Sequence, residues 1–380
     1  DLVPAMQGAL RESMEGVPGP VFVECPIDLL YGETLIREWY GAAGGGKSLA
    51  GKALNWYLQR HLARMFAGSG EVQVGPVGWP EWEAPPSAPV ARVAAALAKA
   101  ERPLLVIGSQ ALLQAPRKTQ IAAAVESLGM PVYLSGMARG LLGSDHPLHM
   151  RHQRRKALKA SDCVLLAGVP CDFRLDYGRH IRRGTTLVSV NRSPKDLRMN
   201  RRPDIGVRTD AGAFLCALAE VLQAEASDTG WLASLRERDA EREAGIDEQA
   251  AAATAFSNPL RLFRELNEVI DEDSVIVADG GDFVATASYT LRPRGPLSWL
   301  DPGVFGTLGV GAGFAMGAKL ARPDSEVWAI YGDGAFGFSL VEFDSFVRHG
   351  IGVIAVIGND AGWAQIAREQ VKILGDDVAT

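Results

Sequence analysis

The sequence has few of the features that mark secreted, membrane-spanning or polyanion-binding proteins. Only four of its 380 residues are cysteines, and aromatic residues make up 7%. Because no CxxC pair occurs and no histidine stands near a cysteine at metal-ligand spacing, neither a disulfide framework nor a zinc site is indicated. The longest apolar runs, residues 104–108 and 353–358, are far shorter than the roughly 18 residues of a membrane-spanning helix. The net charge of −6 provides no overall attraction for nucleic acid. We therefore expect no membrane segment in these residues and no nucleic-acid partner.

What the sequence has instead is the composition of an α/β protein, with 47% hydrophobic residues, 22% charged residues and 42 glycines. From residue 90 onward, short apolar runs alternate with helical stretches, which indicates parallel strands joined by helical crossovers. The runs are residues 104–108, 131–135, 162–168, 185–190 and 205–209. They predict a Rossmann-like parallel-sheet middle domain of about six strands, followed by a second α/β domain.

The order of these patterns divides the chain into five parts. We expect the first to be the tail of a domain, with a helix near residues 2–14 and a strand at residues 21–26. In the last, strands are expected near residues 274–280, 326–334 and 352–360, with no closing strand or helix after them. The parts are residues 1–30, 31–89 (a linker with one helix), 90–226 (the middle domain), 227–257 (a charged linker) and 258–380 (the second α/β domain, which we expect to be cut short).

Polar residues follow two consecutive strands of this last domain. Gly332-Asp333-Gly334 ends one expected strand, Asn359-Asp360 ends the next, and 24 residues lie between them. That spacing accommodates one helix and one strand, so a parallel sheet sets the two loops side by side at the carboxyl ends of neighbouring strands. Ligands of open α/β sheets bind at this edge.

The residue types in these loops suit a diphosphate and a divalent cation. Gly334 permits close approach of the backbone, and a helix that starts near Ala335 directs free N–H groups at an anion. Asp333 and the Asn359/Asp360 pair offer hard oxygen ligands of the kind that Mg²⁺ prefers. The sequence therefore predicts a magnesium-bound diphosphate between the two loops.

The paired motif resembles the signature of thiamine-diphosphate-dependent enzymes, which is GDG, about two dozen residues, and then Asn-Asn. Other segments resemble the same family: PGPVFVECPIDLL resembles the end of its pyrimidine-binding domain, GMARGLLGSDHPLH its middle domain, and DPGVFGTLGVGAGFAMGAKLA the stretch that cradles the aminopyrimidine. The resemblance covers essentially the whole chain. It is strongest to the acetolactate synthase and 2-hydroxyacyl-CoA lyase branches.

The resemblance implies roles for individual residues. Asp333 corresponds to the first metal ligand, Asp360 stands where the second side-chain ligand usually is, with Asn359 beside it, and the carbonyl of Gly362 corresponds to the third. Because the family more often has Asn where this chain has Asp360, either Asn359 or Asp360 is the ligand. The resemblance also implies that the carbonyl of Gly306 accepts from the cofactor amine and that Leu308 is the apolar residue that keeps the cofactor bent. The implied cofactor contacts are Gly281, Asp282, Gly306, Leu308, Gly332, Asp333, Gly334, Ala335 and Asn359.

The resemblance also implies an activity for the whole protein. In the family the thiazolium ring takes up the electrons released by carbon–carbon cleavage. The glutamate that activates the cofactor lies upstream of the segment resembling residues 21–26, so no catalytic residue is expected in this chain, and Glu24 is not that glutamate. The expected substrate is a small molecule: a 2-hydroxyacyl-CoA, cleaved to formyl-CoA and an aldehyde, or pyruvate, joined to acetolactate. A homodimer or homotetramer is implied, as is anchoring in the endoplasmic reticulum membrane by a segment upstream.

Three alternatives belong to other classes. Residues 41–48 match the P-loop pattern, although no buried strand precedes them. Residues 309–317 loosely match a dinucleotide-binding glycine loop, although close helix packing also accounts for their glycines. A non-catalytic module that keeps the fold is the third.

Positive charge is concentrated between Arg151 and Arg208, where 15 Lys and Arg stand against five Asp within 58 residues. Such a run predicts either a solvated face or a site for the phosphates of a substrate such as CoA. The six histidines have no carboxylate or cysteine at ligand spacing, so surface or packing roles are expected for them. Trp363 and Gln365, just past the second loop, are candidates to line the substrate pocket.

Overall fold

A computed structural model describes residues 2–43, 48–71, 73–222 and 230–376 of the chain. It divides into two compact units, residues 1–81 and residues 82–380. This division falls inside residues 31–89, the segment expected from the sequence to be a linker.

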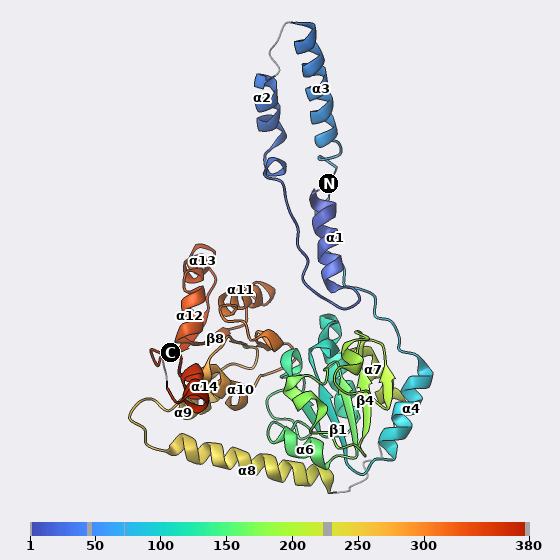
Figure 1. The fold of residues 1–380 in the computed structure, drawn as a ribbon, viewed down its shortest axis with the longest axis vertical. Coiled ribbons are helices and arrows are strands. Elements are labelled where there is room, and N and C mark those ends of the chain that lie inside the picture. The colour runs from blue at the N-terminus through green and yellow to red at the C-terminus, as the bar shows by residue number, and fades with distance from the viewer. Residues whose placement is uncertain (1, 44–47, 72, 223–229, 377–380) are drawn as a thin grey trace. The chain divides into compact units, whose positions relative to one another are not determined.

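The first unit consists of helices and irregular segments (Figure 1). Its elements are α1 (Leu2–Met14), the short 3-10 helix η1 (Ile27–Leu30), α2 (Glu33–Ala43) and α3 (Leu49–Met65). Ile36 and Leu62 are buried, and the side chain of Ser48 caps α3 by accepting the N–H of Gly51 at 3.1 Å. The region expected to be a linker with one helix thus holds two.

The strand predicted at residues 21–26 is wrong. These residues form no strand, and Phe22 is 91% exposed. A strand needs a neighbour that pairs with its backbone N–H and C=O groups, and no described residue of the chain takes that place.

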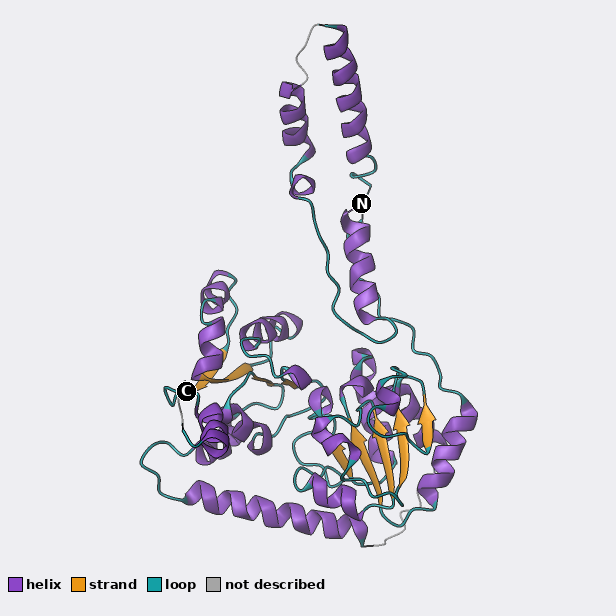
Figure 2. Ribbon diagram, in the orientation of Figure 1, coloured by secondary structure: helices purple, strands orange, loops and turns teal. Residues whose placement is uncertain are grey.

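The middle domain is a five-stranded, wholly parallel sheet with helices on both faces (Figure 2). The strand order is β2-β1-β3-β4-β5, one strand fewer than the approximate prediction. The strands are β1 (Pro103–Ile107), β2 (Val132–Leu134), β3 (Cys163–Ala167), β4 (Thr186–Val190) and β5 (Ile205–Val207). The α-helices are α4 (Ser87–Ala98), α5 (Lys118–Ser127), α6 (Arg154–Ala160) and α7 (Ala211–Val221). Short 3-10 helices are η2 (Ser109–Leu112), η3 (Ala115–Arg117), η4 (Gly136–Ala138), η5 (Phe173–Gly178) and η6 (Asp196–Arg198).

Alternate residues of each strand enter two separate cores, because successive side chains of a strand point to opposite faces. Leu105 and Ile107 pack with α4, α5 and α7, whereas Leu104 and Val106 pack with α6 and the helix that follows α7. Burial on both faces explains why these strands are uninterrupted apolar runs.

The stretch expected to be a charged linker is instead a long helix, α8 (Trp231–Ala251) (Figure 1). The helix was not predicted because charged residues outnumber its widely spaced apolar residues. Trp231 and Leu235 pack in the core of the middle domain, and Ile246 is fully buried near the other end of the helix. In the part of the connection that the structure describes, helix α8 therefore gives these side chains defined places.

The second domain of this unit has a four-stranded parallel sheet in the order β7-β6-β8-β9. The strands are β6 (Val275–Ala278), β7 (Trp299–Leu300), β8 (Val327–Gly332) and β9 (Ile354–Gly358). The helices are α9 (Pro259–Val269), α10 (Asp282–Thr290), η7 (Gly303–Phe305), α11 (Gly311–Ala321), α12 (Asp333–Ser339), α13 (Glu342–Arg348) and α14 (Ala364–Leu374). The short strand β7 was not predicted, because two residues are too few to show the alternation of polar and apolar side chains. The expectation that no helix follows the last strand is wrong, since α14 does.

The predicted fold class, α/β with parallel sheets in both domains, is confirmed. Among the helices of the described residues, none combines the length and the apolarity needed to cross a membrane.

Candidate active site

Three strand ends of the second sheet meet at one cavity. The chain runs from β6 to its neighbour β7 and then crosses to β8 on the other side of β6. In open α/β sheets, ligands bind at such a switch point, outside the carboxyl ends of the strands. A cavity of about 260 Å³ opens there, with walls from the loops after β6, β8 and β9 and from the segment after η7.

Most residues selected from the sequence line this cavity. They are Gly281, Asp282, Gly306, Leu308, Gly332, Asp333, Gly334, Ala335, Asp360 and Gly362. Trp363 and Gln365, the candidates for a substrate pocket, line it as well. Asn359 is in the same loop, where its side-chain oxygen accepts the N–H of Ala361 at 2.9 Å.

Asp333 connects two of the loops. Its Oδ1 accepts the N–H of Gly334 at 2.8 Å, and its Oδ2 accepts the N–H of Ala361 at 2.8 Å. Asn359 Oδ1 accepts that same N–H of Ala361, so an oxygen of Asp333 and an oxygen of Asn359 converge on one point. Asp360 turns its Oδ1 to the N–H of Gly362 at 3.2 Å.

Glycines allow the loops to approach one another. A Cβ on Gly332 would lie 2.9 Å from the carbonyl oxygen of Gly280, and a Cβ on Gly280 would lie 2.0 Å from Cδ2 of Leu308. The space that a side chain would take at Gly280 is thus occupied by Leu308, the residue matched to the cofactor-bending position. A Cβ on Gly334 would contact the indole of Trp363 at 3.2 Å, which places this ring against the start of α12.

Asp279 at the end of β6 anchors the Leu308 segment, and sequence reasoning missed it. Its buried carboxylate accepts the N–H of Gly309 at 3.0 Å and that of Gly311 at 2.8 Å. Burial raises the pKa of the Asp279 carboxyl, while the two N–H groups act in the opposite direction. The available signal was an Asp directly after a buried strand, next to the glycines of ADGGD.

The carboxylate of Asp282, the first residue of α10, is paired with an arginine. Arg368 of α14 donates two hydrogen bonds to it, one of them from Nη1 to Oδ2 at 2.8 Å. These bonds lower the pKa of the Asp282 carboxyl. The pairing reduces the repulsion that this carboxylate would exert on an anion in the cavity.

A second cavity, of about 390 Å³, lies between the middle domain and α10, and we call it the basic cavity. Five arginines line it: Arg139, Arg151, Arg154, Arg155 and Arg174. None of the described residues that line it is acidic. Burial, with Arg151 and Arg139 nearby, lowers the pKa of His149 in its wall to about 3. Part of the predicted positive run therefore gathers at a cavity, together with Arg139 from outside it.

Other arginines of the run have structural roles. Arg192 pairs with Asp210 at 2.7 Å, and Arg201 donates to the carbonyls of Gly178 and Arg182. Most other basic residues of the run, such as Arg179, Arg183 and Arg208, are exposed, as the alternative of a solvated face predicted.

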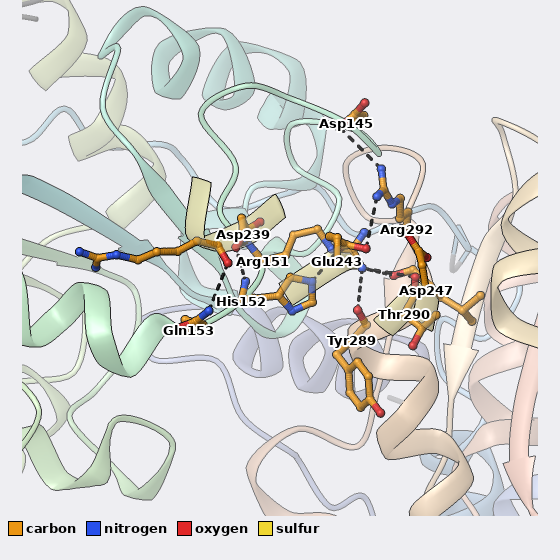
Figure 3. A network of polar contacts seen from close by, with 12 residues as sticks. Asp145, Arg151, His152, Gln153, Asp239, Glu243, Asp247, Tyr289, Thr290 and Arg292 are labelled. Atoms are coloured by element: carbon orange, nitrogen blue, oxygen red, sulfur yellow. Dashed lines mark hydrogen bonds and ion pairs between the residues drawn. The ribbon is translucent and has the colours of Figure 1, made fainter. Parts of the chain in front are cut away.

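A polar network joins α8 to both domains (Figure 3). Asp239 of α8 accepts the backbone N–H groups of Arg151 and His152, and Glu243 accepts from Nε2 of His152 at 2.8 Å and from Arg264 at 2.6 Å. Burial alone would raise the pKa of Glu243, but the hydrogen bonds from His152 and Arg264 hold it at about 2. The partner of His152 lies 91 residues away, so local spacing could not reveal it.

Profiles of one enzyme family match both domains of this unit. Residues 90–218 match "Thiamine pyrophosphate enzyme, central domain", and residues 279–380 match "Thiamine pyrophosphate enzyme, C-terminal TPP binding domain". The chain belongs to the thiamine pyrophosphate enzyme family, as its paired motif predicted, and the cavity beyond β6, β8 and β9 lies in the domain that binds this cofactor.

The similar proteins include members of two branches. The human 2-hydroxyacyl-CoA lyase 2 is 48% identical over the whole chain, and the Caenorhabditis elegans 2-hydroxyacyl-CoA lyase 2 is 44% identical. An acetolactate synthase large subunit of Mycobacterium tuberculosis is 36% identical over 72% of the chain and 49% of its own length. The chain spans 61% of the human protein and 60% of the nematode protein.

Neither nucleotide-binding alternative has support. The P-loop match at residues 41–48 begins inside helix α2, whereas a P-loop follows a buried strand, and residues 44–47 lie outside the described residues. Two of the glycines at residues 309–317 serve close packing: a Cβ on Gly309 would lie 2.6 Å from Cβ of Phe338, and one on Gly311 would lie 2.6 Å from the ring of Tyr331. A Cβ on Gly313 or Gly317 would meet no atom within 4 Å.

Proposed function

We propose that the whole protein is a thiamine-diphosphate- and Mg²⁺-dependent carbon–carbon lyase that cleaves 2-hydroxyacyl-CoA to formyl-CoA and an aldehyde. The observation that carries the proposal is Asp333, which joins the loops after β8 and β9 at the mouth of one cavity in the cofactor-binding domain. The relatives that match this chain over its whole length are named 2-hydroxyacyl-CoA lyase 2, which supports a 2-hydroxyacyl-CoA as the substrate. When bound, the cofactor supplies an electron sink for the cleaved bond.

The residues around the cavity fit a magnesium-bound diphosphate. The glycine-rich starts of α10 and α12 present backbone N–H groups, which suit an anion. Among the described residues, no three His, Cys, Asp or Glu side chains cluster as metal ligands. An ion bound here would complete its coordination with amide, carbonyl, phosphate and water oxygens, which are ligands that Mg²⁺ prefers.

We assign Asp333 and Asn359 as the side-chain ligands, with the carbonyl of Gly362 as a third. The convergence of Asp333 Oδ2 and Asn359 Oδ1 on the N–H of Ala361 supports this pair. Asp360 then has a supporting role, in which its carboxylate holds the N–H of Gly362 and shapes the loop.

Other residues of this cavity would shape and shield the cofactor. Leu308 rests on Gly280 and is fixed through the Gly309 and Gly311 N–H groups on Asp279, so it can keep the cofactor bent. Trp363 packs over Gly334 and limits the access of water to the diphosphate end.

The basic cavity favours an acyl-CoA over pyruvate. CoA carries several phosphate groups, and arginine recognises phosphate with paired N–H donors. Arginines line this cavity and no Asp or Glu does, although Arg174 also pairs with Asp172 behind the wall; this lining suits a polyanionic handle. A small 2-oxo acid has one carboxylate, which does not require a cavity of this size and charge.

Three features of the whole protein complete the proposal, and they rest on the family resemblance. They are a homodimer or homotetramer, a cofactor-activating glutamate from a pyrimidine-binding domain, and a location at the endoplasmic reticulum membrane.

The substrate test uses the full-length protein with thiamine diphosphate and Mg²⁺. Incubation with a 2-hydroxyacyl-CoA should release formyl-CoA and an aldehyde, both measured by mass spectrometry. Formation of acetolactate from pyruvate, without cleavage of the acyl-CoA, would overturn the proposal and favour the carboligase of the acetolactate synthase branch.

The metal test compares single variants by calorimetric titration of Mg²⁺ in the presence of thiamine diphosphate. Asp333→Ala should abolish measurable binding, and Asn359→Ala should weaken it more than Asp360→Ala, which removes a supporting contact worth about 10-fold to 100-fold. Asp344→Ala, on exposed α13, is the control and should bind normally. A larger loss for Asp360→Ala than for Asn359→Ala would reverse the ligand assignment.

A further inference from the structure

Helix α10 borders both cavities. Its first residue, Asp282, lines the cavity at the ends of β6, β8 and β9, which we call the thiamine cavity. Ser288 and Tyr289 near its other end line the basic cavity, as does Leu291 just after it. Nine helical residues span about 13 Å. A displacement at one end of so short a rigid element reaches the other end.

Two arginines of the basic cavity hold the C-terminal end of this helix. Arg139 Nη1 donates to the carbonyl of Ser288 at 2.8 Å. Arg151 Nη2 donates to the carbonyls of Tyr289 at 3.0 Å and Leu291 at 2.9 Å, and more weakly to Thr290 (Figure 3). The last four carbonyls of a helix have no partner within it and carry partial negative charge, so cations there are stabilising.

Charged groups of both signs surround Arg151, and Arg139 is one of its positive neighbours. Burial lowers the pKa of Arg151 to about 10, and Arg292 and Arg139 act in the same direction against Glu243 and Asp239. Arg139 lies over the ring of Trp299 at 4.9 Å, and burial lowers its pKa as well. An anion bound in the cavity would offset the mutual repulsion of these arginines and hold them against the helix end.

We propose that Arg139 and Arg151 are positioning residues through which a phosphate-bearing group in the basic cavity strengthens the binding of thiamine diphosphate at the opposite end of α10. The inference rests on the proposed function only in placing the cofactor in the thiamine cavity. By thermodynamic linkage, the cofactor must strengthen binding of the anion by the same factor.

The experiment is a calorimetric titration of thiamine diphosphate with Mg²⁺, with and without saturating adenosine 3′,5′-bisphosphate, on the full-length protein. For the wild type, the bisphosphate should tighten cofactor binding by about fivefold or more. Arg151→Met should reduce this factor, because the carbonyls of Tyr289 and Leu291 lose the guanidinium while Arg139 still holds Ser288.

Arg155→Met is the matched control. Arg155 lines the same cavity from α6 but is not one of the arginines that hold α10. This variant should need more bisphosphate for saturation and, once saturated, should show the wild-type tightening of cofactor binding.

Hydrogen exchange on the wild type keeps the test independent of whether the Arg151 variant folds. The bisphosphate should slow amide exchange in α10 and leave exchange in α13, away from both cavities, unchanged. Unchanged exchange in α10, unchanged cofactor affinity with bisphosphate bound, or full tightening in Arg151→Met would each overturn the coupling. A failure of thiamine diphosphate to bind under any of these conditions would overturn the proposed function itself.

Discussion

Acidification from about pH 8 to about pH 5 should destabilise the second unit through His149. This side chain is partly buried in the wall of the basic cavity, among Arg151, Arg139, His146 and Arg292. Burial and these positive neighbours lower the pKa of His149 from 6.5 to about 3 in the folded protein. The imidazole is therefore neutral when folded across the range in which it would be protonated when unfolded.

The sign and size of the effect follow from proton binding. Between about pH 6.5 and pH 3 the unfolded chain binds more protons at this residue than the folded one, so stability falls as the pH falls. For a pKa of 6.5 unfolded and about 3 folded, the loss at pH 5 relative to pH 8 is about 2 kcal/mol. Glu243, with a pKa of about 2, retains its stabilisation over this range because that is lost only below its ordinary pKa of 4.5.

Urea denaturation followed by far-UV circular dichroism at pH 8, 6.5 and 5 measures the effect. His149→Gln, which cannot be protonated, should remove about 2 kcal/mol of the pH dependence. His349→Gln, at an exposed position after α13, should leave it unchanged. The reasoning fails if the wild-type and His149→Gln proteins lose the same stability between pH 8 and pH 5.

Two further changes test packing and capping by the same denaturation measurement. Gly358→Ala should lower the free energy of unfolding by about 1–3 kcal/mol, because its Cβ would lie 2.2 Å from Cγ of Phe283. Gly352→Ala is the near-neutral control, because its Cβ would have no atom within 4 Å. Equal losses of stability in the two variants would contradict the packing argument. Asp210→Ala should cost about 3 kcal/mol, because it removes the cap of α7 and leaves the mostly buried Arg192 without its carboxylate. A loss below about 1 kcal/mol would show that this pair is not part of the core.

Prediction from sequence succeeded where the signal was local and failed where distant segments determine the outcome. The spacing of Asp333 and Asp360 could be interpreted because parallel strands align consecutive loops, and both residues line one cavity. The strand predicted at residues 21–26 had the right composition but no neighbour among the described residues. Helix α8 was mistaken for a linker because its abundant charges outweighed Trp231 and Leu235, whose burial depends on the sheet beneath them.

By itself, the order of residues determined the alternation of strands and helices, the parallel sheets and the loops that carry Gly, Asp and Asn. Those features depend on neighbours within a few residues, through side-chain periodicity and backbone freedom. The tertiary structure alone decided that Arg139 and Arg151 reach the end of α10, about 140 residues further along the chain, and that five arginines enclose one cavity. Such contacts arise from the packing of separate domains, and no local pattern encodes which surfaces will meet.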